Sequence, residues 1–370
     1  MKYYIIAGEA SGDLHGSNLV RELVKLDRSA DIRAWGGDMM AAKGATVVKH
    51  YRDLAFMGFV EVIKNLPTIL DNLKFCKKDI LAFRPDVLIL IDYPGFNLRV
   101  ATWAKNQGFP VIYYISPQVW AWKESRVKSI RKVVDKMLVI LPFEKEFYNK
   151  WDYKVEYVGH PLVQVVNDFV DSNKTDARQD KKTIALLPGS RKQEVAKKLP
   201  IMLEASRSFA QYKFVVAKAP SLPDEFYHTF LANYPHVDSV RDQTYGLLTR
   251  SAAAMVTSGT ATLETALFGV PQVVCYKGSA ISYQIARRLV KIKYISLVNL
   301  IMDKPVVTEL IQNELTVPNL TKELDLLLHD SKKIEQVTKD YSELKKLLQE
   351  NEDASARAAQ EIIGFLQSNS

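Results

Sequence analysis

Short apolar runs alternate with segments of helical period along this chain, and that alternation constrains the fold more than any other feature. The run at 86–91, Asp-Val-Leu-Ile-Leu-Ile, is typical of a strand buried on both faces. Leu73, Cys76 and Ile80 recur at spacings of three and four residues, which predicts the buried stripe of a helix. Strands that alternate with helices indicate a parallel α/β architecture.

The same pattern runs through both halves of the 370 residues, and at roughly 150 residues per domain this length favours two domains. A polar, charged stretch at 167–182 is the best linker candidate. We therefore expect two Rossmann-like domains with parallel sheets facing a central cleft, at 1–166 and 183–345, and a helix in 346–370 that packs back on the first domain. The strands are expected at 2–7, 31–35, 46–48, 86–91, 111–115, 137–141, 155–158, 183–187, 213–217, 252–257 and 272–276.

Charge and cysteine content narrow the class of protein. Fifty basic and 42 acidic residues give a net charge of +8, which favours an anionic partner without choosing which one. The two cysteines, Cys76 and Cys275, lie in apolar stretches and are expected to be buried thiols in a reducing compartment. No apolar run approaches the ~18 residues of a membrane span. We expect a cytoplasmic protein, and peripheral membrane contact stays open.

Candidate chemistry in the first half lies in two turns that follow strands. The segment 8–16 (GEASGDLHG) has glycines between a strand and a helix, which suit either a ligand loop or a simple tight turn. Asp92 ends an apolar strand before a Pro-Gly turn, where it is a candidate general base or a turn-forming residue. His15 and His160 are alternative bases, although a lone histidine is more often structural.

Two turns of the second half suit an anion. Arg191 follows Pro-Gly-Ser where a strand meets a helix, and Ser258-Gly-Thr260 occupies the same place after another strand. Glu264 lies one helical turn further on and could hold sugar hydroxyls. An exposed arginine or ordinary helix caps would explain each segment alone. Together they favour a nucleotide-diphosphate pocket at the carboxyl ends of two strands.

Two basic stretches and one apolar segment suit an amphiphilic surface. Residues 120–132 and 286–293 mix indole or aliphatic groups with cations, and either could bind lipid headgroups or be a solvated helix face. Residues 54–60 (LAFMGFV) could cover the core or take up acyl chains. The sequence contains no Asp-x-Asp, and no metal-ligand spacing stands out, which disfavours metal-assisted chemistry.

The motifs resemble those of the lipid-A-disaccharide synthase family, and they occur in the family's order over nearly the whole chain. The blocks that carry the resemblance are IIAGEASGDLHG at 5–16, DLAFMGFVEVI at 53–63, IDYPGFNLR at 91–99, YYISPQVWAWKESRV at 113–127, VGHPL at 158–162, LLPGSRKQEV at 186–195, SGTATLE at 258–264 and RRLVKIKYISLVNLI at 287–301.

The resemblance implies an inverting glycosyltransferase of the GT-B fold, in family 19. It implies a UDP-2,3-diacylglucosamine donor, a 2,3-diacylglucosamine 1-phosphate acceptor, and a β-1,6-linked lipid A disaccharide 1-phosphate plus UDP as products. It further implies peripheral contact with the inner-membrane surface, no cofactor, no metal and no nucleic acid. Whether the chain forms a homodimer stays open.

Residue roles follow from the resemblance by position. Asp92 is expected to be the catalytic base or an essential acidic residue, and Ser11, Gly12 and Asp13 to face the acceptor or the transferred sugar. Val298 and Thr308 stand where the family usually has proline, which weakens the orientation argument for their neighbours. The expected UDP contacts are Gly189, Ser190, Arg191, Ser258, Gly259, Thr260, Glu264, Asn299, Glu309 and Gln312.

Two other classes of function remain. A related GT-B enzyme could use another UDP-sugar, as a lipid-linked N-acetylglucosamine transferase or a UDP-sugar epimerase would. A non-catalytic nucleic-acid or membrane-binding protein is suggested only by the basic surplus, and RNA-binding signatures are absent from the sequence.

Overall fold

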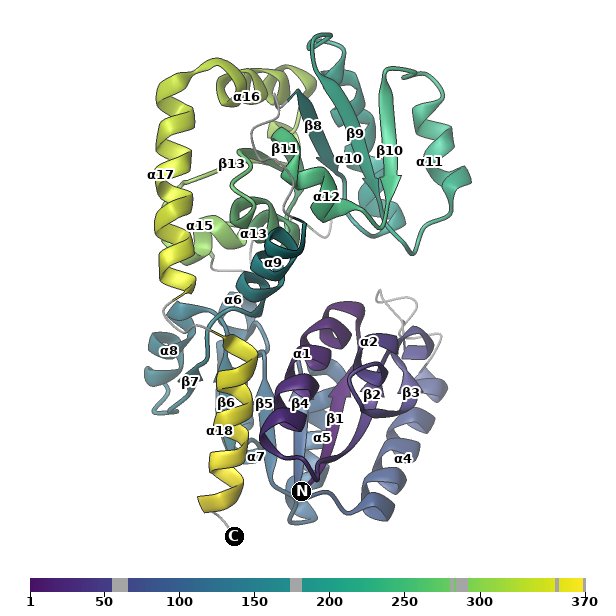
Figure 1. Cartoon of the computed structure of the whole chain (residues 1–370), viewed down its shortest axis with the longest axis vertical. Coiled ribbons are helices and arrows are strands. Elements are labelled where there is room, and N and C mark those ends of the chain that lie inside the picture. The colour runs from purple at the N-terminus through teal and green to yellow at the C-terminus, as the bar shows by residue number, and fades with distance from the viewer. Residues whose placement is uncertain (55–65, 174–181, 280–282, 284–291, 350–352, 369–370) are drawn as a thin grey trace. The chain divides into compact units, whose positions relative to one another are not determined.

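Two parallel β-sheets, one in each of two structural units, organise the chain (Figure 1). Unit 1 comprises residues 1–161 and 349–370, and unit 2 comprises residues 162–348. The computed structural model describes residues 1–54, 66–173, 182–279, 283, 292–349 and 353–368.

The sheet of unit 1 has seven strands among the described residues, in the order β3-β2-β1-β4-β5-β6-β7. All its recorded pairings are parallel, and Ala7 at the end of β1 pairs with Ile91 at the end of β4. The turns after these two strands therefore begin side by side. The strands are β1 (Lys2–Ala7), β2 (Asp31–Gly36), β3 (Thr46–His50), β4 (Val87–Ile91), β5 (Val111–Tyr114), β6 (Lys136–Val139) and β7 (Glu156–Tyr157).

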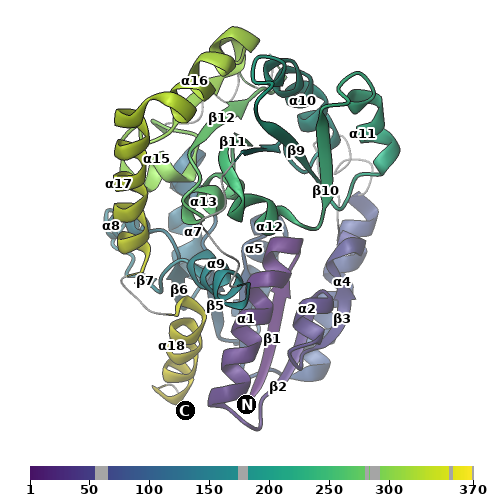
Figure 2. The same cartoon turned by 45° about the horizontal axis from the view of Figure 1, so that its top comes forward.

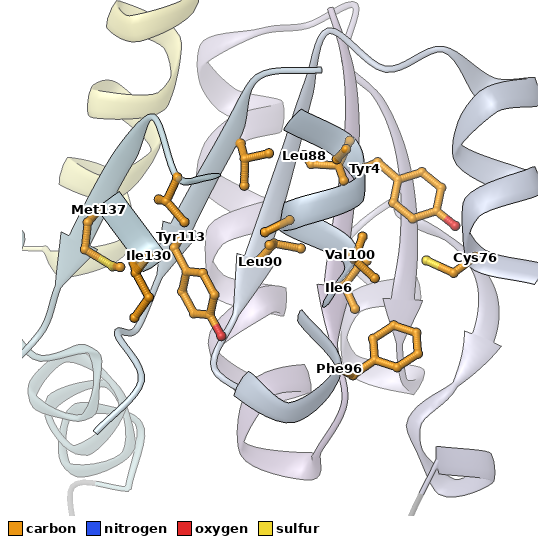
Figure 3. Packing of buried hydrophobic residues seen from close by; sticks show 14 of the residues in the cluster. Tyr4, Ile6, Cys76, Leu88, Leu90, Phe96, Val100, Tyr113, Ile130 and Met137 are labelled. Carbon is orange, nitrogen blue, oxygen red and sulfur yellow. The ribbon is translucent and has the colours of Figure 1, made fainter. Parts of the chain in front are cut away.

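Helices on both faces of this sheet bury its apolar residues. On one face, Leu88 and Leu90 of β4, Val100 of α5 and Ile130 of α7 belong to one apolar cluster, in which Cys76 of α4 lies on the side of Tyr4 (Figure 3). Complete burial of such aliphatic side chains contributes about 1.5–3 kcal/mol each. The helices of unit 1 are α1 (Ala10–Leu26), α2 (Asp38–Ala41), α4 (Leu66–Phe83), α5 (Pro94–Asn106), α6 (Val119–Trp122), α7 (Val127–Val133), α8 (Pro142–Asn149) and α18 (Ala354–Ser368), with 3-10 turns at Tyr51–Leu54 and Glu124–Arg126.

The C-terminal helix α18 belongs to unit 1 although it follows unit 2 in the chain. It packs along α1 (Figure 2). The ammonium of Lys136 on β6 donates to the carboxylate of Glu361 at 2.6 Å. Buried Ala358 and Ile362 form the apolar face of the helix, so its amphipathic pattern accounts for its docking.

The sheet of unit 2 has six strands among the described residues, in the order β10-β9-β8-β11-β12-β13, again paired in parallel. The strands are β8 (Thr183–Leu187), β9 (Lys213–Lys218), β10 (Val237–Arg241), β11 (Ser251–Thr257), β12 (Gln272–Tyr276) and β13 (Thr308–Ile311). The helices are α9 (Pro161–Ser172), α10 (Lys192–Ser206), α11 (Asp224–Leu231), α12 (Thr244–Thr249), α13 (Thr260–Leu267), α15 (Leu297–Met302), α16 (Val317–His329) and α17 (Ser331–Leu348), with a 3-10 turn at Gln312–Glu314.

The expected linker differs from the structure at its beginning. Residues 167–172 continue helix α9 instead of leaving it. Phe169 explains the difference, because its ring packs edge-on against Tyr245 at 5.4 Å and Phe268 at 6.0 Å. These two aromatic contacts anchor a helical turn that is otherwise mostly polar. Residues 174–181 of the linker lie outside the described part of the chain.

Within the residues that the structure describes, none of the helices combines the length and hydrophobicity that a bilayer span requires.

Candidate functional site

Asp92 stands in a sharply constrained turn at the carboxyl end of β4. Both Asp92 and Tyr93 have left-handed backbones, with φ of 45° and 48°. The buried amide of Asn97 donates to the Asp92 carbonyl at 2.7 Å, and the Tyr113 hydroxyl donates to the same oxygen at 2.5 Å. Backbone strain of this kind persists only where the surroundings hold it, and it gathers at functional sites.

The environment of the Asp92 carboxyl suits a base. Burial, and then the charge of the neighbouring Glu9 carboxylate, raises its pKa from the ordinary 3.8 to about 6. A general base works best when its pKa lies close to the working pH. Asp92 is therefore ionised at neutral pH and still basic enough to accept a proton.

Glycines of the first loop allow close packing beside Asp92. A Cβ on Gly8 would lie 2.3 Å from the Tyr93 ring, so that ring closes over the loop only because residue 8 has no side chain. A Cβ on Gly12 would lie 3.1 Å from the Ala7 Cβ. Gly12 thus lets α1 approach β1, while Ser11 is exposed in the first turn of the helix.

Asp13 accepts hydrogen bonds from backbone groups of its own unit. Its buried carboxylate accepts the backbone N–H groups of Gly37 at 2.7 Å, Met40 at 3.1 Å and Met39 at 3.2 Å. These are the unpaired donors at the start of α2. Asp13 therefore holds the 37–40 turn, and of the three expected first-loop residues only Ser11 presents an exposed side chain.

His15 and His160 are both buried in unit 1. Burial lowers the pKa of His15 to about 4. Burial, and then the charge of His15, lowers that of His160 to about 3. Both rings are therefore neutral at physiological pH. Asp92, which is ionised there, is the better base of the three.

The loop after β5 contains a residue with a strained backbone and is anchored by hydrogen bonds to buried side chains. Ile115 has a φ of 64°, a costly conformation for a β-branched residue. The next residue, Ser116, donates to the buried Glu144 carboxylate at 2.7 Å and lies 2.9 Å from the Tyr148 hydroxyl. Burial raises the pKa of Glu144 to about 7. Glu144 was not anticipated from the sequence, where it lies outside every motif block.

In unit 2, the turn 189–191 starts helix α10. Gly189 has a φ of 117°, and a Cβ there would lie 2.7 Å from the Glu194 carboxylate. Arg191 occupies the N-cap, where it supplies no capping oxygen to the first-turn amides. Its side chain is 64% exposed and lies 3.5 Å from Glu194. Ser190 is exposed beside it.

The turn 258–260 starts helix α13 in the same way. Its N-cap is Gly259, with a φ of 135°, which again brings no side-chain acceptor to the first-turn N–H groups. Because Leu187 pairs with Val256 in the sheet, the two turns leave adjacent strands at one edge. Two helix N-termini that converge in this way favour an anion.

Glu264 and Ser258 are each held by a neighbour. The Tyr245 hydroxyl donates to Glu264 at 2.8 Å, and burial raises the pKa of that carboxyl. The Ser258 hydroxyl donates to the Ile295 carbonyl at 2.8 Å. Tyr245 was not anticipated, since no motif contains it.

Asn299 and Glu309 hold the segment 295–299 in place through hydrogen bonds. The Asn299 side chain exchanges two hydrogen bonds of 2.9 Å with the Val307 backbone and donates a third to Glu309. Glu309 also accepts the N–H of Ile295 at 3.0 Å and of Ser296 at 2.9 Å. The structure thus makes both residues supports of the 295–299 segment, with Asn299 only 1% exposed.

Gln312, an expected UDP contact, has a buried side-chain nitrogen, Nε2, without a hydrogen-bond partner among the described residues. Its backbone is left-handed, with φ of 53°. A Cβ on Gly278 would lie 3.4 Å from that nitrogen, so the amide lies against a glycine turn that follows β12.

A buried lysine lies close to the turns 189–191 and 258–260, and it was not anticipated from the sequence. Lys198 on α10 donates from Nζ to the Thr257 hydroxyl and lies 3.7 Å from Glu194. Its signal in the sequence is a cation in the apolar stripe that Val195 and Met202 define. Of the expected segments 54–60 and 286–293, residues 55–60 and 286–291 lie outside the described residues, and so does most of the block at 53–63.

Comparison with known proteins identifies a matching family and relatives of this chain. The family model for lipid-A-disaccharide synthetase matches residues 3–363. The lipid-A-disaccharide synthase of Syntrophus aciditrophicus (strain SB) is 41% identical over 351 residues, which are 92% of this chain and 92% of that protein.

Solved structures of low identity share the fold. The UDP-GlcNAc 2-epimerase of Neisseria meningitidis, solved bound to UDP-GlcNAc, covers 100% of both chains with a TM-score of 0.69 at 13% identity. The calicheamicin glycosyltransferase covers 100% of this chain and 99% of its own with a TM-score of 0.63 at 15% identity. The expected two-domain α/β fold class is confirmed. By the family match and the identity of its relative, this chain belongs to the lipid-A-disaccharide synthetase family.

Proposed function

We propose that this protein joins UDP-2,3-diacylglucosamine to 2,3-diacylglucosamine 1-phosphate, and forms the β-1,6-linked lipid A disaccharide 1-phosphate and UDP. The observation that carries the proposal is the match of residues 3–363 to the lipid-A-disaccharide synthetase family. The geometry within each unit supports a donor side in unit 2 and an acceptor side in unit 1.

Unit 2 is the proposed donor side. The diphosphate would lie between the turns 189–191 and 258–260, where two helix N-termini offer backbone N–H groups. The exposed guanidinium of Arg191 supplies a bidentate charged donor. Glu264 would accept the ribose hydroxyls, and Gln312 would use its buried, unpaired amide on the donor. Ser258 orients its turn through the Ile295 carbonyl.

Unit 1 is the proposed acceptor side, with Asp92 as the catalytic base. The carboxylate accepts the proton of the acceptor's 6-hydroxyl while that oxygen bonds to the anomeric carbon of the donor. The bond from this carbon to the diphosphate breaks in the same step, which inverts its configuration. UDP leaves with the electron pair, and Arg191 and the first-turn amides of α13 stabilise its charge.

Substrates with four acyl chains in total require a lipid-like surface, and we propose peripheral contact with the inner membrane. Trp122 supports this, because its ring is 50% exposed and stacks with the Arg126 guanidinium at 4.9 Å. An exposed indole next to a cation suits the interface between headgroups and acyl chains.

A mass-spectrometric assay of the purified protein tests the proposal. Incubation with both diacylated sugars should yield the tetra-acylated disaccharide phosphate together with UDP. The control replaces the donor with UDP-N-acetylglucosamine, which carries no long acyl chains. Turnover of that control donor, or its epimerisation, in place of disaccharide formation would contradict the proposal.

A further inference from the structure

Lys198 is a charged residue in a position that a helix normally gives to an apolar one. It lies on α10 between the buried Val195 and Met202, and its side chain is 3% exposed. Removing an ammonium from water is costly unless the group is paired and hydrogen-bonded. Its partners therefore indicate why a lysine is placed there.

Those partners belong to both anion-binding turns. The ammonium donates to Thr257, the last residue of β11, which directly precedes the turn 258–260. It also lies 3.7 Å from Glu194, and a Cβ on Gly189 of the turn 189–191 would stand 3.5 Å from it. Lys198 is thus the point where the bases of the two turns meet.

The negative charge of Glu194 is the charge that this cation compensates. Its carboxylate lies in the first turn of α10, near both Gly189 and Arg191. An anion bound by that helix N-terminus would meet a like charge, which weakens binding. Arg191 lies near one oxygen of this carboxylate, and the buried Lys198 lies near the other, where its charge compensates that of Glu194.

We propose that Lys198 is a positioning residue of the donor site, which compensates Glu194 and ties Thr257 to helix α10 so that both turns can hold a diphosphate. This inference rests on the proposed function, because it assumes that UDP binds at these turns. Burial lowers the pKa of Lys198, and the charge of the Glu194 carboxylate opposes that change.

Calorimetry with UDP and NMR titration with uridine test the proposal on the purified full chain. Lys198→Met keeps the length of the side chain and removes its charge, so the affinity for UDP should fall about tenfold or more. The affinity for uridine, which has no phosphate, should stay within about twofold. Lys197→Met is the matched control, with UDP affinity expected to equal that of the wild type.

Rescue separates charge compensation from a loss of packing. In the double variant Glu194→Gln/Lys198→Met, the uncompensated carboxylate is gone, and UDP affinity should recover to within about threefold of the wild type. Unchanged UDP affinity in Lys198→Met, an equal loss for UDP and uridine, or no recovery in the double variant would each overturn the proposal.

A second variant serves if Lys198→Met does not fold. Glu194→Gln alone leaves Lys198 charged and removes the repulsion, so UDP should bind several-fold more tightly; equal or weaker binding overturns the proposal. A wild type that binds uridine and UDP equally weakly refutes the donor site itself, whereas normal wild-type binding with unaltered variants refutes only the role of Lys198.

Discussion

Asp92→Asn should make the folded protein more stable at neutral pH, because burial in the folded state disfavours the ionised carboxylate of the wild type. Burial, and then Glu9, raises the pKa of Asp92 from 3.8 to about 6. One pKa unit corresponds to about 1.4 kcal/mol, so ionised Asp92 lowers the free energy of unfolding by about 3 kcal/mol at pH 7. Asparagine has nearly the same shape and tolerates the left-handed backbone. Because the substitution also weakens a backbone hydrogen bond to the carboxylate, we expect a gain of about 1–3 kcal/mol.

The sign of the pH dependence distinguishes this cause from ordinary repacking. Between pH 3.8 and 6 the folded wild type binds more protons than the unfolded chain, so its stability falls as the pH rises through this window. Below the window both states carry a protonated carboxyl, and the difference from the variant should disappear. Above it the difference should be complete.

Urea unfolding of both proteins at a series of pH values from about 4 to 8 measures the difference directly. The reasoning is refuted if Asp92→Asn is less stable than the wild type at pH 7, or if the difference between them does not change across the window.

Three further substitutions test separate parts of the site. Arg191→Ala should weaken UDP binding by about 1.5–3 kcal/mol, measured by calorimetry, and unchanged affinity would remove Arg191 from the donor site. Gly8→Ala should displace the Tyr93 ring, since its Cβ would lie 2.3 Å from that ring, and lower turnover in the product assay; full activity would show that the loop need not pack this closely. Ser116→Ala should lower the free energy of unfolding by about 1–3 kcal/mol because buried Glu144 loses a hydrogen bond, and an unaltered urea midpoint would contradict this.

Periodicity predicted the sheets well where the strands are apolar after their first residue. The runs at 2–7, 183–187 and 272–276 coincide with β1, β8 and β12, because a strand covered on both faces is a nearly continuous apolar run. Strands β10 and β13 were missed. Each stands at an edge of its sheet, where polar residues such as Asp238 and Glu309 are tolerated.

Motif spacing located the turns of the site but not the partners of each side chain. The adjacency of the 189–191 and 258–260 turns follows from parallel pairing, which the sequence pattern could indicate. That Asp13 binds the amides of the 37–40 turn could not be predicted, because it depends on tertiary contacts between distant segments. Lys198 was overlooked for the same reason, since a lysine among apolar residues has no local sign of its partners.

The rate of disaccharide formation by Asp92→Asn, with UDP affinity measured on the same preparation, tests the account most directly. Loss of the base should reduce turnover by about a hundredfold or more and leave UDP affinity unchanged. Near-normal turnover in this variant would show that another group accepts the proton and would contradict the assignment of Asp92.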